Sequence, residues 1–170
     1  SGCIQPEDVA ARIADDIHDL EERNTPNVRA IRRRHSRRLK FADGDLVVDV
    51  AWVLLEEYGH RWVAYELVRD HEAAFQSLSE ADLESLGAGM DSCAAVDAFA
   101  RTLSGPAWLH GLISDAPMHR WACAESRWWR RAALVSAVAL NVRSHGGTGD
   151  PERTLAVCHQ LAADDDGTVV

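Results

Sequence analysis

Asp97 is a carboxylate placed in an apolar helical pattern, where a carboxylate does not normally belong. Helical spacing puts it on one stripe with Cys93, Val96, Ala100 and Leu103. Burying an unpaired carboxylate is strongly unfavourable unless an opposite charge or hydrogen bonds compensate it. Asp97 therefore needs either a partner inside the protein or a task that requires its charge.

Arg131 is the partner that we expect for Asp97. In the segment WACAESRWWRRAALVSAVALNVR, helical spacing places Trp128, Val135 and Val138 on the same face as Arg131, and the run that follows is apolar on nearly every side. Such a helix lies centrally in a fold, so its Arg lies near the interior. We therefore expect the two side chains to meet.

A run of positive charge lies upstream of this pair. Residues 24 to 42 contain seven Arg or Lys and no Asp or Glu, in a pattern that predicts a helix capped by Thr25 with Pro26 in its first position. Its inward stripe is Val28, Ile31, His35 and Leu39. Its cations cover the remaining surface: Arg29, Arg32, Arg33, Arg34, Arg37, Arg38 and Lys40. Like charges repel, which favours a phosphate-backbone partner, although a solvated face neutralised by the acidic helix Glu7–Glu22 explains the same pattern.

The composition is that of one ordinary soluble domain. The chain has 170 residues, 46% of them hydrophobic and 26% charged, with a net charge of −9. Its four cysteines form no C-x-x-C pair, which indicates reduced thiols in a cytoplasmic protein rather than a secreted disulfide framework. No apolar run approaches the roughly 18 residues of a membrane span and no leader pattern is present, so we expect neither a span nor export. We expect a monomer.

The chain otherwise reads as one helix after another, and no stretch alternates as a strand meander would. The predicted helices cover residues 6–23, 25–40, 43–58, 61–75, 79–86, a stretch from an N-cap at Asp91 to a break at Ser104-Gly105-Pro106, 117–124, the region around Arg131, and 150–163. Antiparallel helix pairs that recur every roughly 35 to 45 residues are typical of an α-solenoid of HEAT-like units, whose concave face suits a long polyanion. We predict an all-α fold in which residues 1–170 form a single HEAT-like helical-repeat domain.

The tryptophans and the remaining polar motifs point less clearly to a functional site than Asp97, Arg131 and the basic run do. Trp52 and Trp62 have core-like spacing, whereas Trp128 either packs in the core or forms a surface that can stack on a sugar or base. His119 and Cys123 share a helix face as metal ligands can, but without a second ligand pair we expect no metal site. HGGTGD lacks the Lys of a P-loop and G-x-S-x-G is absent, so we expect no cofactor and no serine nucleophile.

Three segments carry a resemblance to a known family: LGAGMDSCAAVDAFARTLSGPAW, WACAESRWWRRAALVS and GGTGDPERTLAVC. They resemble the DNA alkylation repair family, the AlkD-like alkylpurine DNA glycosylases that are built from HEAT-like repeats. TPNVRAIRRR and RWVAYELVRDHE resemble the amino-terminal half of that family. The pieces fall in family order over nearly the whole chain.

The resemblance implies base excision repair of duplex DNA that carries purines alkylated at N3 or N7. Alkylation makes the base cationic, so it leaves neutral without a general acid, and the protein has to stabilise an oxocarbenium-like sugar and place a water near it. Asp97 matches the catalytic Asp of the family, and Arg131 matches its active-site Arg, which helps to keep Asp97 ionised. The expected DNA-binding positions are Trp128, Cys93, Arg130, Arg29, Arg33, Arg34 and Arg37. The family grips the duplex through its backbone, without a base pocket.

Two departures from the family pattern leave other functions open. Cys93 stands where the family commonly has a Trp, and a thiol cannot offer the aromatic surface that packs on a cationic sugar. The family also continues past AADDDGTVV into a helix with a second active-site Trp, so we expect this chain to be truncated there or to be a shortened paralogue. The alternatives are a catalytically weakened paralogue that binds DNA by shape and a HEAT-like protein-interaction scaffold.

Overall fold

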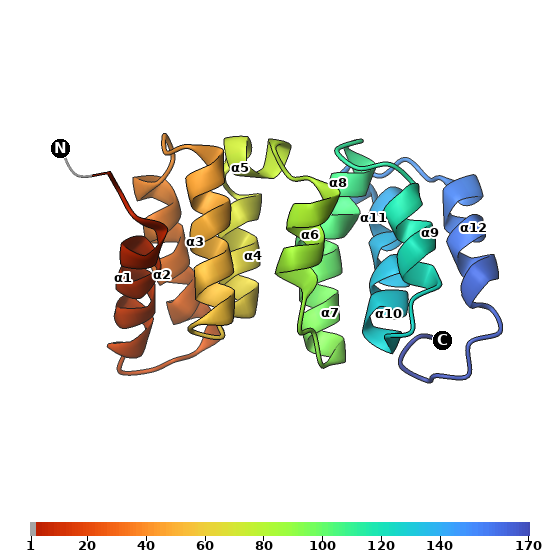
Figure 1. The fold of residues 1–170 in the computed structure, drawn as a ribbon, viewed down its shortest axis with the longest axis horizontal. Coiled ribbons are helices and arrows are strands. Elements are labelled where there is room, and N and C mark those ends of the chain that lie inside the picture. Colours follow the sequence, from red (N-terminus) through yellow and green to blue (C-terminus); the bar gives the residue numbers. More distant parts are fainter. Residues whose placement is uncertain (1–2) are drawn as a thin grey trace. The chain divides into compact units, whose positions relative to one another are not determined.

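The computed structural model describes residues 3–170, and every regular element in that range is a helix (Figure 1). The predicted all-α fold made of HEAT-like antiparallel helix pairs is confirmed. The chain divides into two compact units, with the boundary between Ser77 and Leu78, and the single domain expected over residues 1–170 stays a prediction. No helix in the described range is long and apolar enough to cross a membrane.

The first unit consists of two antiparallel helix pairs followed by one short helix (Figure 1). They are α1 (Pro6–His18), α2 (Thr25–Arg38), α3 (Gly44–Glu56), α4 (Arg61–Arg69) and α5 (Glu72–Gln76). Helix α3 packs against both α1 and α4, and Ile13, Leu54 and Tyr65 are fully buried between them. In α2 the predicted inward residues Ile31 and His35 are buried, as its helical period requires.

The second unit contains two nearly continuous helical rods, each preceded by a shorter antiparallel helix (Figure 1). The elements are α6 (Glu80–Gly87), α7 (Cys93–Phe99), the π turn η1 (Ala100–Ser104), α8 (Gly105–Leu109), α9 (Ala116–Ala122), α10 (Arg127–Ser136), α11 (Val138–Asn141), the short 3-10 helix η2 (Arg143–His145) and α12 (Pro151–Leu161). We call α7, η1 and α8 the Asp97 rod, and α10 with α11 the Arg131 rod. The two rods pack against each other.

Two helix starts lie one residue away from the predicted N-caps. Ser92, and not Asp91, caps α7, because its hydroxyl accepts a hydrogen bond from the Ala95 N–H at 3.1 Å. At α2 the cap is Asn24 in place of Thr25, and its side-chain oxygen accepts from the Asn27 N–H at 2.9 Å. In both cases the residue next to the predicted one has the extended backbone conformation that an N-cap needs.

The predicted helix over residues 61–75 is in fact two helices. Helix α4 ends at Arg69, and His71 starts α5 by accepting the Ala74 N–H on its Nδ1 at 3.0 Å. The other ring nitrogen of His71 lies 3.0 Å from the carbonyl oxygen of Leu39. The buried imidazole therefore stabilises the bend between α4 and α5 by bonding two backbone groups.

The break expected at Ser104-Gly105-Pro106 is wrong, because the helix continues through it. The π turn η1 is followed directly by α8. A π turn is wider than an α-helical turn and accommodates Pro106, which has no N–H to donate. A Cβ at position 105 would lie 2.6 Å from the carbonyl oxygen of Ala100 in the same rod and 3.0 Å from the Cβ of Ala139 in the other rod, so glycine avoids a clash within the π turn and lets the rods approach closely.

Other differences concern helix ends and one tryptophan. Helix α1 ends at His18, earlier than predicted, and the helix with Arg131 is interrupted at Ala137 before α11. The core position expected for Trp52 is wrong: the side chain is 45% exposed, because Ala51 and Val53 beside it occupy the inward positions of α3.

Candidate active site

The Asp97 rod and the Arg131 rod run in the same direction. Asp97 contacts Arg131, and further along both rods the Ser104 hydroxyl lies 2.8 Å from the Ser136 hydroxyl. Because both residue numbers rise together along the interface, the rods are parallel, as Figure 1 also shows. Ser136 in turn donates to the carbonyl oxygen of Ala132 at 2.6 Å, so this buried hydroxyl pair is fully hydrogen-bonded.

The expected pairing of Asp97 with Arg131 is present and bidentate. The Arg131 Nε donates to one carboxylate oxygen at 3.0 Å, and its Nη2 donates to the other at 3.1 Å. The Arg131 and Asp97 side chains are 23% and 27% exposed, so the pair lies at the surface edge of the rods rather than inside the core. A fork of this kind holds the carboxylate in one orientation while leaving part of it accessible.

A third hydrogen bond fixes the guanidinium from its other side. Arg131 Nη1 donates to the carbonyl oxygen of Thr168 at 2.6 Å. The hydrogen bonds to Asp97 raise the pKa of Arg131, and burial acts against this more weakly. The negative charge of Asp97 is thus matched by a permanent positive charge that is held in place on two sides.

Arg130 has a structural role in addition to its expected one. Its Nε donates to Asp164 at 2.6 Å, and its Nη1 donates to the carbonyl oxygens of Ala124 and Glu125 at 3.0 and 2.7 Å. These bonds connect α10 to the loop before it and to the segment after α12. Contact of Arg130 with DNA stays a prediction, and in it a phosphate would compete with these internal partners for the guanidinium.

Cys93 and Trp128 both lie near the Asp97–Arg131 pair and are half-buried. Cys93 is the first residue of α7, and it is close enough to Arg131 to contribute electrostatically to the raised pKa of the guanidinium. The Arg127 guanidinium lies 4.7 Å above the Trp128 ring and 3.5 Å from Asp166. Trp128 therefore offers a partly exposed ring with a cation above it, at one end of the site.

A cluster of three aromatic rings, Phe99, Trp121 and Trp129, packs against the helices that carry Asp97 and Arg131. The Trp129 ring meets Phe99 edge-on at 5.7 Å and Trp121 at 4.8 Å between centroids. Gly87 at the end of α6 lies so close that a Cβ there would be 2.5 Å from the Cη2 of Trp129. The cluster fixes α10 against α7 and α9, and thereby the position of Arg131 opposite Asp97.

Three of the cations of α2 already have acidic partners. Arg29 forms a bidentate pair with Glu66, and Arg34 lies 2.9 Å from Asp16. The surface position expected for Arg32 is wrong: it is only 4% exposed, because Glu66 and Asp70 of the α4 region accept its hydrogen bonds. Buried guanidinium groups require such partners.

Further cations at the end of α2 line a shallow groove. A cavity of about 400 Å³ is bordered by Arg32, Arg33, Ser36, Arg37, Lys40 and Asp70. Arg33 and Arg37 are exposed, and neither takes part in an ion pair of the described residues. Because Asp70 pairs with the buried Arg32, the exposed Arg33, Arg37 and Lys40 make this groove positively charged and a suitable surface for a phosphate.

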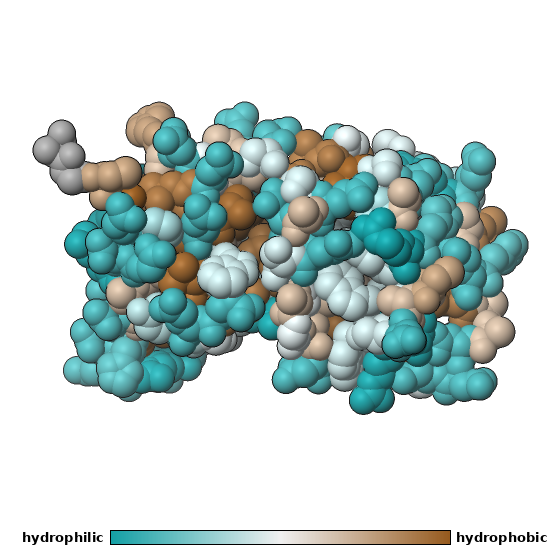
Figure 2. All heavy atoms as spheres, viewed as in Figure 1, coloured by the Kyte–Doolittle hydropathy of each residue, from teal (hydrophilic) through white to brown (hydrophobic). Residues whose placement is uncertain are grey.

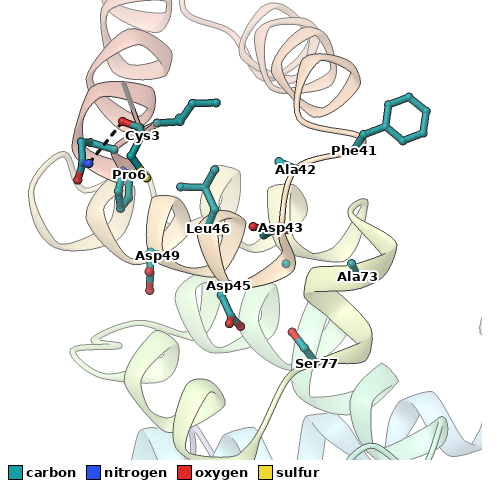
Figure 3. A pocket seen from close by; sticks show the side chains of 13 residues that line it. Cys3, Pro6, Phe41, Ala42, Asp43, Asp45, Leu46, Asp49, Ala73 and Ser77 are labelled. Atoms are coloured by element: carbon teal, nitrogen blue, oxygen red, sulfur yellow. Dashed lines mark hydrogen bonds between the residues drawn. The ribbon is translucent and has the colours of Figure 1, made fainter. Parts of the chain in front are cut away.

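A second groove of the first unit has the opposite charge (Figure 3). It has a volume of about 780 Å³, and Asp43, Asp45 and Asp49 line it together with Leu46 and the 93% exposed Phe41. Figure 2 shows hydrophobic atoms of this unit exposed beside the amino-terminal segment. Three carboxylates and no lining cation repel a polyanion, so this groove is not a DNA-binding candidate.

His119 of α9 and Cys123 at the C-cap of that helix both contact Gln160 of α12. Gln160 lies between them: its Oε1 is 2.7 Å from His119 Nδ1, and its Nε2 is 3.5 Å from Cys123 Sγ. No group of three or more His, Cys, Asp or Glu residues within 3–170 is arranged to hold a metal ion.

The comparisons with known proteins give a family for most of the chain. A family model described as DNA alkylation repair enzyme matches residues 23–169, a stretch that includes α2, Asp97 and Arg131. No curated protein matches the chain, and no solved structure matches it.

Proposed function

The chain belongs to the DNA alkylation repair enzyme family, and on that premise we propose that it is a DNA glycosylase that releases N3- and N7-alkylated purines from duplex DNA. The bidentate pair between Asp97 and Arg131 is the observation that carries this proposal. It provides an oriented and partly accessible carboxylate, which is the group that the reaction needs.

The chemistry requires little besides this carboxylate. A purine alkylated at N3 or N7 carries a positive charge and leaves the sugar as a neutral base, so no general acid has to protonate it. The bond between base and sugar breaks with both electrons going to the base, and the sugar becomes oxocarbenium-like. A carboxylate in a cleft of low dielectric stabilises that cation and orients the water that attacks it.

Arg131 prepares Asp97 for this role. Its fork and its bond to Thr168 hold the carboxylate in one orientation before substrate arrives, so little reorganisation is needed during the reaction. The half-buried Trp128 ring offers a face on which a sugar or base can stack. Cys93 lies on the same side, one helical turn before Asp97.

Contact with the phosphate backbone of DNA requires exposed cations. In the first unit these are Arg33 and Arg37 at the basic groove of α2. Arg29 and Arg34 can add to them only by sharing the carboxylates that they already bind. The net charge of −9 makes such local positive surfaces necessary for any contact with DNA.

Asp97→Asn is the decisive test. The amide keeps the size of the carboxylate and one of its two acceptor oxygens but removes the charge, so release of N7-methylguanine from a duplex should fall by about 10²-fold or more. Binding to the duplex should stay the same or tighten, because a negative charge has left the site. Single-turnover release and fluorescence anisotropy measure the two effects.

Glu84→Gln is the matched control. Glu84 is another carboxylate of the second unit that accepts hydrogen bonds from an arginine, Arg120, and from Trp121. Its neutralisation should leave base release unchanged. Equal release by Asp97→Asn and by the wild type would end the assignment of glycosylase chemistry to this site.

A non-catalytic DNA-binding protein is the second candidate. Both carboxylate oxygens of Asp97 already accept hydrogen bonds from Arg131, which is what a purely structural clamp between the rods would show. This candidate predicts salt-dependent binding to duplex DNA without release of any base. A protein-interaction scaffold, by contrast, predicts no salt-dependent DNA binding.

A further inference from the structure

Arg101 is an exposed arginine one helical turn beyond Asp97. It lies in the π turn η1 of the Asp97 rod, and residues four apart share one face of a helix. No ion pair of the described residues involves Arg101. The other arginines on the neighbouring helices of this unit are all paired with carboxylates: Arg120, Arg127, Arg130, Arg131 and Arg153.

The parallel direction of the two rods places cations on both sides of the candidate site. Arg101 follows Asp97 by four residues on one rod, and Arg127 precedes Arg131 by four residues on the other. At a rise of about 1.5 Å per residue, each guanidinium-bearing position lies about 6 Å along the rods from the Asp97–Arg131 pair, in opposite directions. The carboxylate thus has a positively charged residue before it and another after it.

Arg101 differs from the other charged residues near Asp97 because their charges are paired. Asp97 and Arg131 neutralise each other, and Arg127 is partly neutralised by Asp166 at 3.5 Å. Among Asp97, Arg131, Arg127, Asp166 and Arg101, only Arg101 has no oppositely charged partner in an ion pair of the described residues. A DNA strand can bring a sugar to Asp97 only if the phosphates next to that sugar are attracted and held, and guanidinium groups bind phosphate oxygens in two-pronged contacts.

We propose that Arg101 binds the backbone phosphate that adjoins the sugar at Asp97 and thereby positions that sugar for base release. The part of this inference that concerns positioning the sugar for base release rests on the proposed glycosylase function. The phosphate contact itself is independent of the reaction, because it can be measured on DNA that carries no lesion.

Arg143 supplies a matched control. It is also exposed, belongs to the same unit, and takes part in no ion pair of the described residues, but it lies in η2, beyond the end of the Arg131 rod. Arg101→Ala and Arg143→Ala change the net charge of the protein equally. Any difference in DNA binding between the two variants is therefore due to the position of the arginine and not to the total charge of the protein.

The first measurement is the binding of a fluorescein-labelled duplex without lesion, by anisotropy, over a series of NaCl concentrations. Because Arg101→Ala removes the side chain that holds one phosphate, the slope of log K against log salt should decrease by about 0.9. Arg101→Lys should keep most of the slope, and Arg143→Ala should keep all of it. Thermal melting of each variant shows that the fold is intact. An unchanged slope in Arg101→Ala overturns the phosphate contact.

The second measurement separates this inference from the proposed function. With a duplex that contains N7-methylguanine and with protein in saturating excess, Arg101→Ala should release the base more slowly than wild type, and Arg101→Lys should recover most of the rate. Equal rates of base release by the wild type and by Arg101→Ala would overturn the positioning role but not the phosphate contact. A reduced salt slope in Arg101→Ala together with no release by wild type would overturn the glycosylase function and leave the phosphate contact standing.

Discussion

Substitution of Cys93 should raise the rate of the proposed reaction. Cys93→Trp places an aromatic ring one turn before Asp97, where its face can cover a cationic sugar. We expect single-turnover release of N7-methylguanine to be faster than with the wild type. The larger side chain can cost about 1 to 3 kcal/mol through overpacking, so the melting temperature has to be measured beside the rate. Cys93→Leu adds bulk without a ring, and equal acceleration by both variants would contradict an aromatic effect.

The pairing of Asp97 with Arg131 could be predicted because each charge interrupts an apolar stripe of a helix. The burial of Arg32 could not be, because its partners Glu66 and Asp70 lie 34 and 38 residues later and belong to a different region. The bond from Arg131 to Thr168 is also invisible in the sequence, since its acceptor is a backbone carbonyl, which every residue has. Side-chain patterns reveal anomalous residues, but they do not reveal which distant group compensates them.

Helix α2 should provide sequence-independent affinity for duplex DNA through Arg33 and Arg37. Replacing both with Ser should weaken binding and reduce the salt slope by about 0.9 for each phosphate that the variant no longer binds. Arg34→Ser is the comparison within the same helix: it should reduce the slope less, because Arg34 already pairs with Asp16. Anisotropy over a salt series measures all three proteins. Identical slopes for the double variant and the wild type would mean that α2 is only a solvated face.

Most helices could be predicted from apolar spacing and start signals, as the Asp150 cap of α12 illustrates: its carboxylate accepts the Arg153 N–H at 3.0 Å. Two irregularities could not. The His71 bend depends on a tertiary bond to Leu39, and the π turn keeps a helix going at Pro106, where proline usually ends one. Local rules fail at these places because packing between helices outweighs them.

Thermal stability of the chain should fall on acidification, first through His35, which is buried, and His60, which is half-buried. Burial lowers the pKa of His35, more than its bond to Asp16 raises it, and burial also lowers the pKa of His60. The unfolded chain therefore binds more protons below the ordinary histidine pKa of 6.5. The stability that these groups confer is complete above that value and is lost progressively below it. We expect the melting temperature to fall between about pH 7.5 and about pH 5.5.

A second decrease should follow in stronger acid. The hydrogen bond from His35 lowers the pKa of Asp16, and the hydrogen bonds from Arg120 and Trp121 lower that of Glu84. These carboxylates stabilise the fold above their ordinary pKa values of 3.8 and 4.5 and cease to do so as the pH falls through the lowered values. In a double variant, His35→Gln with His60→Gln, the first decrease should shrink, while the part of the second decrease that comes from Glu84 remains. A melting temperature that stays constant above pH 5.5 in the wild type would contradict the assignment to the histidines.

The π turn between α7 and α8 also has a consequence for how the gene can vary. A π turn closes hydrogen bonds between residues five apart instead of four, so it takes up about one extra residue and leaves the direction of the residues after it nearly unchanged. An in-frame deletion of one of the codons for Ala100 to Leu103 would therefore restore an ordinary α-helical turn and keep Ser104 facing Ser136. Over evolutionary time, this five-residue segment should tolerate the loss of one residue better than the regular helices on either side of it, where a deletion turns the residues that follow by about 100°.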